Sequence, residues 1–558
     1  MMKKLLALLL ALLTMFSIVA CGGDDPQDSY VEPDEYTKDG KLKIEFFGVD
    51  FDSLQSKTTD TQLIMDVIEN KFNVSFSILN GSAASWKQQL SQRIGGGDVP
   101  DIFFHTKNEP AYSTWLESKY LFNYSEMLDA YPNLKAAFNR FPVNGVKAML
   151  GGDYYSYPIV MDQTTDSNVI NEHALYYRRD WYTNLVAKNW TPSSGRALVD
   201  PEDPNFNYNN FYDLCEGFTK GDPDNNGKDD TYGYSLTKDG GVYWWYPLLS
   251  MHGVLLDGWE KDANGKWVPE ALSDKMKEAV MWIADMYDNG FINSNYATTT
   301  TQTVMKNNFV NGQAGMMTYN ATFPMGKGVL DLMEQYAKGG KVLSDVVRAM
   351  PVVTGSNGKK QVFGYPNFYG FLAINNDVSE NKKKTILSIM DWMLTAEGMQ
   401  LLNYGIEGTH YKMEGGQLVS LLGKDEAGYP KTLYDLTVAP GIYRIKSLVS
   451  WSTIIPTTIE HYEEQMQLLT AWERKYLVVD ELSYVSADTS FALKISALEE
   501  LKSDKFQEIV NKISGASTAD AKRQRREEIW NDFVTSYKRQ GDTYITEINE
   551  KAKSQLGL

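Results

Sequence analysis

The stretch DPDNNGKDDTYG at residues 222–233 carries oxygen-bearing side chains at alternate positions, with a glycine at its centre. These are positions 1, 3, 5 and 9 of an EF-hand-type calcium loop, and Gly227 stands where such a loop turns sharply. The predicted ligands are the side chains of Asp222, Asp224, Asn226 and Asp230 and the main-chain carbonyl of Lys228. Position 12 is Gly233 instead of the usual glutamate, and the same residue types also form turns that bind nothing. The spacing favours a structural calcium site.

The N-terminal residues predict export and lipid attachment. MMKKLLALLLALLTMFSIVACGG combines two lysines, an apolar run too short for a stable membrane span, and a small residue before Cys21, as in the bacterial lipobox. We expect a signal peptide over residues 1–20, a lipid-modified Cys21 and an acidic flexible tether over 21–40. An ordinary signal peptide with a coincidental cysteine is the alternative. The other cysteine, Cys215, then has no disulfide partner.

Charge narrows the set of partners. The chain has 558 residues and a formal net charge of -18, and loss of the signal peptide with its two lysines makes it more acidic still. Nucleic acid and anionic membrane surfaces are therefore excluded as expected partners. No later stretch is apolar enough to cross a bilayer, so we expect the body outside the bacterial cytoplasmic membrane, on its outer face or periplasmic side, held by lipid only.

From residue 41 the hydrophobic pattern predicts alternating strands and helices. KLKIEFFGV, VSFSI and VPDIFF are strand-like, and two helical stretches separate them. The first helix is expected to bury Leu63, Ile64, Val67, Ile68 and Phe72, and the second Trp86, Leu90 and Ile94. This order predicts an α/β fold with a doubly wound sheet, whose ligands bind beyond the carboxyl ends of the strands, near HTKNE at 105–109.

The second half of the chain is richer in helical patterns. In TADAKRQRREEIWNDFVTSYKRQG, Ile529, Phe533 and Tyr537 form an apolar stripe, and Gly541 is expected to end the helix. A chain of this length is expected to divide into more than one lobe.

Several stretches, in order, resemble the extracellular solute-binding lipoproteins of bacterial ABC importers, the family 1 type related to LplA-like and oligosaccharide-binding proteins. They are GGGDVPDIFF, YYRRDWYTNL, the calcium loop, NNFVNGQAGMM and DWMLTAEGMQLLNYGIEGTHY. The resemblance implies a two-lobed, periplasmic-binding-protein-like α/β fold with a hinge and a helix-rich C-terminal part. It also implies a monomer that is not an enzyme and that delivers its ligand to ABC transporter permease subunits.

The resemblance further implies where the chain crosses the hinge. We expect crossings after SYPIV, near MMTYNAT and near FYGFLAIN. Lobe 1 would then comprise 41–160 plus 320–370, and lobe 2 would comprise 161–319 plus 371–558. Oligosaccharide-binding relatives carry a structural calcium in the second lobe, with an acidic ligand just after the ninth loop position. Here that residue is Thr231, so Asp229 or water would have to compensate.

Sugar sites combine aromatic platforms with fixed hydrogen-bonding groups. The polar candidates at strand ends and expected crossings are His105, Lys107, Asp162, Arg178 and Asn320. The aromatic candidates are Trp244, Trp245, Tyr319, Tyr369 and Trp451. Core packing is the alternative for each ring, and an ion pair with Asp180 is the alternative for Arg178. If VYWWYP is a strand, Trp244 and Trp245 point to opposite faces, so at most one of them stacks on a ligand.

The aromatic and polar candidate residues together predict an oligosaccharide as the ligand. A peptide-like or other polar solute is the alternative. Net acidity favours a neutral glycan unless Lys107 or Arg444 reverses the local field. Two other classes stay open, a calcium-dependent polysaccharide hydrolase or lyase and a surface lipoprotein that holds glycans. The paired acids Glu463–Glu464, Glu499–Glu500 and Glu527–Glu528 are interpreted as solvated helix surface and not as a catalytic pair.

Overall fold

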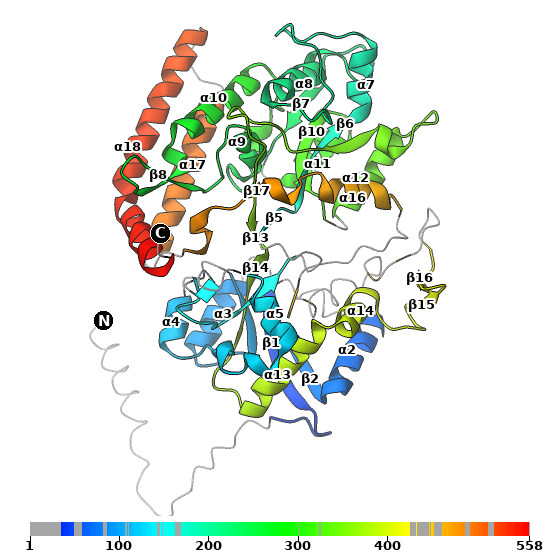
Figure 1. Cartoon of the computed structure of the whole chain (residues 1–558), viewed down its shortest axis with the longest axis vertical. Coiled ribbons are helices and arrows are strands. Elements are labelled where there is room, and N and C mark those ends of the chain that lie inside the picture. The colour runs from blue at the N-terminus through cyan, green and yellow to red at the C-terminus, as the bar shows by residue number, and fades with distance from the viewer. Residues whose placement is uncertain are drawn as a thin grey trace, which may run out of the picture.

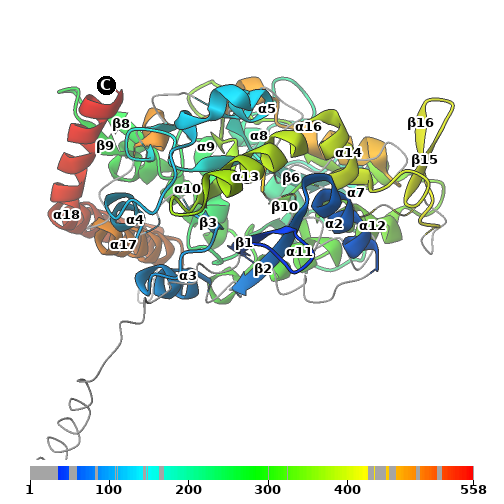
Figure 2. The same cartoon turned by 90° about the horizontal axis from the view of Figure 1, so that it is seen from below.

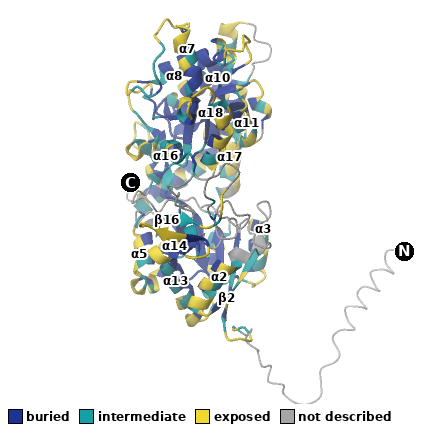
Figure 3. Cartoon of the chain, turned by 90° about the vertical axis from the view of Figure 1, so that its right-hand side faces the viewer, coloured by how far each residue is buried: buried dark blue, intermediate teal, exposed yellow. Residues whose placement is uncertain are grey.

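Two lobes, each with its own hydrophobic core, are stacked along the long axis of the molecule (Figure 1). The computed structural model describes residues 35–49, 59–81, 86–106, 111–141, 149–161, 169–299, 301–322, 325–424, 460–485, 491–511 and 518–556, with isolated positions at 109, 146–147, 431, 433, 446 and 448–450. Buried residues gather inside each lobe (Figure 3).

The first lobe is built on a five-stranded sheet. Its strands follow the order β2(Val74–Gly81), β1(Leu42–Val49), β3(Ile102–His105), β14(Phe368–Ile374) and β4(Tyr157–Val160). β1 is parallel to β2 and β3, which confirms the predicted β-α-β-α-β start. β14 is antiparallel to both of its neighbours, so the sheet is mixed.

Helices cover both faces of this sheet. α2(Thr59–Phe72), α13(Glu380–Met393) and α5(Pro132–Phe138) pack side by side, and α3(Trp86–Gly95) lies on the other face (Figure 2). α3 buries Trp86, Leu90 and Ile94 as predicted. In α2 the buried face consists of Ile64, Met65 and Ile68, whereas Leu63 and Val67 are more than a third exposed, so the predicted face was rotated. The remaining elements of this lobe are α4(Tyr112–Glu117), α14(Ala396–Tyr404) and the hairpin of β15(Tyr411–Glu414) and β16(Gln417–Ser420).

The second lobe is built on a four-stranded sheet. Its order is β11(Val347–Met350), β6(His173–Arg178), β10(Ala314–Asn320) and β7(Tyr232–Ser235). Helices packed against these strands are α7(Arg179–Ala187), α8(Tyr208–Lys220), α11(Gln302–Val310) and α16(Tyr462–Thr470). Farther out lie α9(Tyr246–Ser250), α10(Asp274–Asp288), α12(Met325–Met333) and the hairpin of β8(Trp259–Lys261) and β9(Trp267–Pro269).

Two long helices, α17(Ala492–Val510) and α18(Ala519–Lys551), flank the second lobe and confirm the helix-rich C-terminal part (Figure 1). Ile529, Phe533 and Tyr537 are buried along α18, as predicted. The prediction that Gly541 ends this helix was wrong, because α18 continues to Lys551. Gly541 is instead a point of close packing, since a Cβ atom there would lie 3.3 Å from the Leu498 side chain of α17.

The lobes are joined by short paired strands, β5(Val169–Ile170) and β13(Tyr365–Pro366). The strand pairing assigns some segments to a different lobe from the one predicted. β11 pairs with β6, so residues 347–350 lie in the second lobe, and β14 with α13 and α14 lies in the first. MMTYN forms the inner strand β10, whose continuous burial comes from its two sheet neighbours and not from a crossing. The chain therefore returns to the first lobe at β13.

Among the described residues, none of the helices combines the length and the apolar character needed to span a bilayer.

Candidate functional site

The candidate site lies at the edges of the two sheets that meet at the hinge. In the first lobe, β4 leads toward β5 and β13 leads directly into β14. The carboxyl end of β3 lies toward the same edge, because His105 pairs with Phe371 of β14, which in turn pairs with Pro158 of β4. In the second lobe, β5 leads into β6, and Asn320 at the carboxyl end of β10 pairs with His173 at the start of β6.

His105 sits at this edge as a buried, neutral imidazole. It is 2% exposed, its Nε2 lies 2.8 Å from Ser156 Oγ, and its Nδ1 lies 3.1 Å from the Thr106 carbonyl. Its ring stacks on Phe371 at 5.2 Å and lies 4.8 Å from the Tyr112 ring. Burial lowers the pKa of His105 to about 4. These contacts fix the ring within the edge of the first lobe.

On the facing edge of the second lobe, the His173 imidazole lies among aromatic rings. The Trp244 ring is 5.1 Å away, nearly perpendicular to it, and the rings of Tyr243 and Tyr246 are about as close, at 6.0 and 5.9 Å. Burial lowers the pKa of His173 to about 4, so this ring is neutral as well. The neighbouring Glu172 amide donates to the hydroxyl of Tyr365 in the hinge strand β13, at 3.1 Å. The aromatic group is therefore connected to the hinge.

The expectation that VYWWYP forms a strand was wrong. Residues Tyr243–Trp245 form a 3-10 helix that runs into α9. Trp245 is fully buried in the core of the second lobe, whereas Trp244 is 5% exposed beside His173. Pro247 favours this helical start, because proline fits the first turn of a helix.

Arg178 lies at the opposite end of β6 from the hinge. Its guanidinium forms a bidentate ion pair with Asp180 at 2.7 and 2.8 Å, and it stacks over the Trp181 and Tyr336 rings. Its side chain is 3% exposed. The alternative of an ion pair with Asp180 is the arrangement seen here.

The other predicted ligand residues differ in how far they are described. Tyr319 is buried in β10, and Asn320 Oδ1 accepts hydrogen bonds from the amide and hydroxyl of Thr322, at 2.8 and 2.6 Å. The Asn320 side chain therefore caps the turn after β10. Lys107, Asp162, Arg444, Trp451 and Cys21 lie outside the described residues, as does the side chain of Tyr369.

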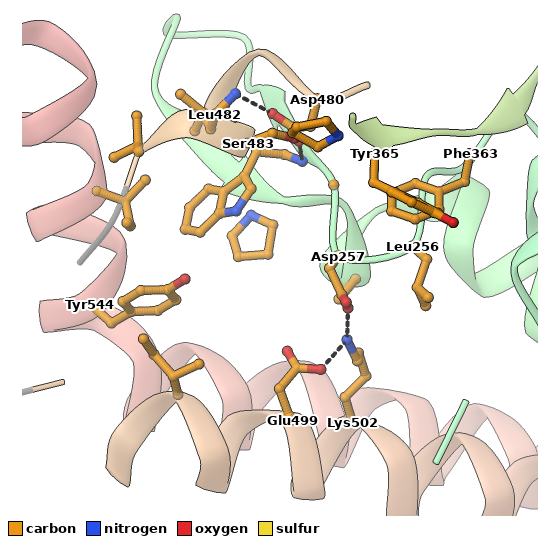
Figure 4. A pocket seen from close by; sticks show the side chains of 18 of the residues that line it. Leu256, Asp257, Phe363, Tyr365, Asp480, Leu482, Ser483, Glu499, Lys502 and Tyr544 are labelled. Carbon is orange, nitrogen blue, oxygen red and sulfur yellow. Dashed lines mark hydrogen bonds and ion pairs between the residues drawn. The ribbon is translucent and has the colours of Figure 1, made fainter. Parts of the chain in front are cut away.

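A cavity of about 460 Å³ lies beside the hinge, between the hinge strands and the C-terminal helices (Figure 4). Its aromatic lining consists of Trp259, Phe363, Tyr365, Phe368, Tyr537 and Tyr544. Its polar lining includes Asp257, Asp480, Ser483, Glu499 and Lys502. Rings and hydrogen-bonding groups in one cavity form a surface suited to a ligand with both apolar and hydroxyl-bearing sides.

The charged groups of this cavity form a network around Lys502. Its ammonium pairs with Asp257 and, at 2.5 Å, with Glu499, and the Lys502 side chain is 3% exposed (Figure 4). Burial alone would lower the pKa of Lys502, but the two carboxylates outweigh burial and raise it. Both carboxylates are about half exposed, so their oxygens stay accessible from the cavity.

Asp480 serves a positioning role in the same cavity. Its carboxylate accepts from the main-chain amides of Trp259 and Leu482, and so fixes the start of the β8–β9 hairpin beside the cavity. None of these residues was among the predicted site residues. The sequence interpretation of Glu499 as solvated surface misses this pair, although its spacing of three from Lys502 is a signal for an ion pair on one helix face.

The predicted calcium loop joins α8 to β7 in the second lobe, at the end of a helix capped by Asn207. Asn225 and Gly227 have φ values of 60° and 74°, the left-handed backbone that lets a short loop curl. The Asn226 side-chain amide donates to Asp224 at 2.8 Å and to Asp230 at 3.1 Å. Two carboxylates therefore converge on one point.

The electrostatics of this loop suit a cation. Partial burial, together with the negative charges of Asp230 and Asp222, raises the pKa of Asp224. A dication between these carboxylates would relieve the repulsion. Lys188 donates to Asp222 at 3.1 Å and partly compensates its charge. Thr231 is 5% exposed and its hydroxyl donates to the Phe218 carbonyl at 2.7 Å, so it is an anchor of the loop and not a ligand. Asp224, Asn226 and Asp230 thus lie close together with oxygen-bearing side chains of the kind calcium takes, and calcium binding by these residues with Asp222 and Lys228 stays a prediction.

Comparison with known proteins gives one family. The model for bacterial extracellular solute-binding protein matches residues 55–400. Two curated relatives come from Bacillus subtilis (strain 168). Lipoprotein LipO is 24% identical over 408 residues, covering 71% of this chain and 70% of LipO. The polygalacturonan/rhamnogalacturonan-binding protein YtcQ is 22% identical over 378 residues, covering 67% of each chain.

Solved structures share the fold. A solute-binding protein from Bifidobacterium longum infantis, described as binding HMO and associated with an ABC transporter, superposes with a TM-score of 0.66 at 14% identity, covering 92% of this chain and 99% of its own. The ABC-transporter substrate-binding protein FusA of S. pneumoniae, in complex with kestose, gives 0.62 at 17% identity, covering 92% and 100%. A FusA EF-hand mutant in complex with fructo-nystose gives 0.60 at 16%, with the same coverage.

Proposed function

Because the chain belongs to the bacterial extracellular solute-binding protein family, whose members bind solutes and are not enzymes, we propose that it is the oligosaccharide receptor of an ABC importer. In this proposal two lobes close around the glycan, a lipid on Cys21 holds the protein at the membrane, and the loaded form delivers its ligand to the permease. The hydrolase or lyase alternative does not fit membership of this family. A glycan-holding lipoprotein would lack ligand-driven closure.

The observation that carries the proposal is the cavity beside the hinge. Tyr365 and Pro366 of β13 line it and also form the strand pair that joins the lobes. A ligand that contacts these residues touches the hinge itself. If the closed form offers more such contacts than the open form, ligand binding shifts the population toward closure.

The lining supports a sugar as the ligand. Trp259 and Tyr544 supply flat apolar surface, and Asp257, Glu499 and Lys502 supply acceptors and donors within the same cavity. Sugar rings present apolar faces edged by hydroxyls, so both kinds of group are needed at once. The B. longum neighbour is described as binding HMO, FusA was solved in complex with kestose, and YtcQ is a polygalacturonan/rhamnogalacturonan-binding protein, which supports a glycan as the ligand here.

Two accessory features complete the proposal. The loop at 222–233 binds calcium for structural stability, since its carboxylates converge within a single connection between α8 and β7. One solved variant of FusA, which shares the fold, is described as an EF-hand mutant, and this supports a calcium loop of the same type here. Lipid attachment at Cys21 draws support from the lipobox-like sequence and from the relative named lipoprotein LipO.

The test is titration with neutral and acidic oligosaccharides, followed by calorimetry and by small-angle scattering. We expect saturable binding with a decrease in the radius of gyration and no cleavage of the glycan. Trp259→Ala should weaken binding by about 1 to 4 kcal/mol, as is typical for an aromatic hot spot. Trp190→Ala removes a partly buried tryptophan that packs near Gly217, away from the cavity, and should leave affinity unchanged. No binding across the panel, or equal effects of both variants, would refute the proposal.

A further inference from the structure

A second cluster of metal-ligand side chains lies where α12 and α16 pack against each other, on the edge of the second lobe that faces the first (Figure 1). Asp331 belongs to α12, and Glu460 and His461 immediately precede α16. One ligand atom from each of these residues lies within 4.8 Å of the others, and among the described residues this is the one group of three or more such side chains. The cluster is separate from both the hinge cavity and the calcium loop.

The distances match donors around a single ion. His461 Nε2 lies 3.6 Å from Glu460 Oε1 and 4.0 Å from Glu334 Oε2. Ligands bound at about 2.0 to 2.2 Å in tetrahedral geometry lie roughly 3.4 Å from one another. A small side-chain adjustment would therefore bring these atoms into one coordination sphere.

The Nε2 atom of His461 has no hydrogen-bond partner among the residues that the structure describes. This atom is shielded from solvent, and it faces two carboxylates. A buried nitrogen without a partner is costly, and a metal ion would satisfy it. Glu460 is 7% exposed, whereas the side chains of Asp331 and Glu334 are about half exposed, which leaves a path for an ion from solvent.

The charge balance also favours a dication. Asp331, Glu334 and Glu460 contribute three carboxylates, and Lys327 donates to both Asp331 oxygens at 2.9 Å. Lys327 occupies the carboxylate that a metal would use, so it competes with metal binding. One imidazole with carboxylates suits zinc, whereas calcium prefers oxygen ligands only.

We propose that Asp331, Glu460 and His461, with Glu334 at the rim, form a zinc site. The ion would tie α12 to the residues that open α16. It would thereby fix the position at which α16 begins in the second lobe.

The experiment measures zinc binding to chelator-stripped full chain, by competition with a chromophoric chelator, in excess calcium so that the calcium loop is saturated. We expect one zinc per chain and a rise in melting temperature. His461→Ala and Asp331→Asn should each weaken zinc binding more than tenfold and abolish the thermal shift. Glu463→Gln, an exposed acid on the same helix, should bind zinc as the unmodified chain does.

The Lys327→Met variant should give a result that is expected for a metal site but not for a cluster that only stabilises the fold. Removing the competing ammonium should tighten zinc binding severalfold. Asp331→Asn changes an exposed side chain, so it keeps the test valid if His461→Ala fails to fold. The proposal is overturned if the unmodified chain binds no zinc, if Asp331→Asn binds it equally well, or if Lys327→Met weakens binding.

Discussion

Acidification should destabilise the first lobe through His105. The ring is 2% exposed and its pKa is about 4, whereas an unfolded histidine has a pKa near 6.5. Above pH 6.5 both states are neutral, and the favourable contacts of the neutral ring are fully present. As the pH falls toward 4, the unfolded state binds a proton that the folded state resists, so the free energy of unfolding decreases. At pH 4.5 the loss from this residue alone is about 2.5 kcal/mol.

The variant that isolates this effect is His105→Gln. Glutamine stays neutral at all these pH values and can still accept from Ser156 and donate to the Thr106 carbonyl, although it loses the stacking on Phe371. We expect the variant to be less stable at pH 7.5, but to lose about 2.5 kcal/mol less than the unmodified chain between pH 7.5 and 4.5. Urea unfolding at both pH values gives the difference, and imidazole NMR gives the pKa directly. Equal losses in the two proteins, or a measured pKa of His105 near 6.5, would refute the reasoning.

Three further predictions concern the second lobe. Removing calcium with EGTA should lower the melting temperature, because an ion at a hundredfold excess over its Kd stabilises the folded state by about 2.7 kcal/mol. Asp224→Asn should remove this effect of EGTA. A melting curve of the unmodified chain that is insensitive to EGTA would contradict the site. Gly541→Leu should lower the free energy of unfolding by about 1 to 3 kcal/mol, because the new side chain would meet Leu498. The control Gly328→Ala, on the exposed face of α12, should stabilise the protein slightly. Equal denaturation midpoints of the two variants would contradict the packing at Gly541. Arg178→Met should cost about 3 kcal/mol by leaving Asp180 buried without its partner, with no change in glycan affinity, and a loss of affinity without a loss of stability would restore Arg178 as a ligand residue.

The spacing of apolar residues predicted the features of the fold that depend on neighbouring residues in the sequence. Trp86, Leu90 and Ile94 repeat at helical spacing and are buried together, and the alternation of strands and helices gave the parallel start of the first sheet. The lobe boundaries failed because they depend on pairing between distant segments. Nothing near β14 indicates that it inserts between β3 and β4, or that β11 pairs with β6.

The site was harder to predict for the same reason. Asp257 and Lys502 form an ion pair across 245 positions, and Trp259 and Tyr544 approach each other from distant parts of the sequence. Each residue alone resembles ordinary surface or core. The calcium loop could be found because all its ligands lie within one short continuous stretch.

The strand pairing at the lobe junction has a consequence for how the chain can be divided. Val160 at the end of β4 is the register partner of Phe368 at the start of β14, and the Met161 amide donates to the Asn367 carbonyl at 3.3 Å. The two strands are antiparallel neighbours, so everything between them is topologically an insertion at the tip of a β-hairpin. A two-residue turn joining residue 160 to residue 368 would bypass that insertion and close the hairpin directly. The first lobe is thus an interrupted domain that can be made contiguous by deleting this insertion and ending the chain before α16, which offers a route to express it alone and to measure its share of ligand affinity.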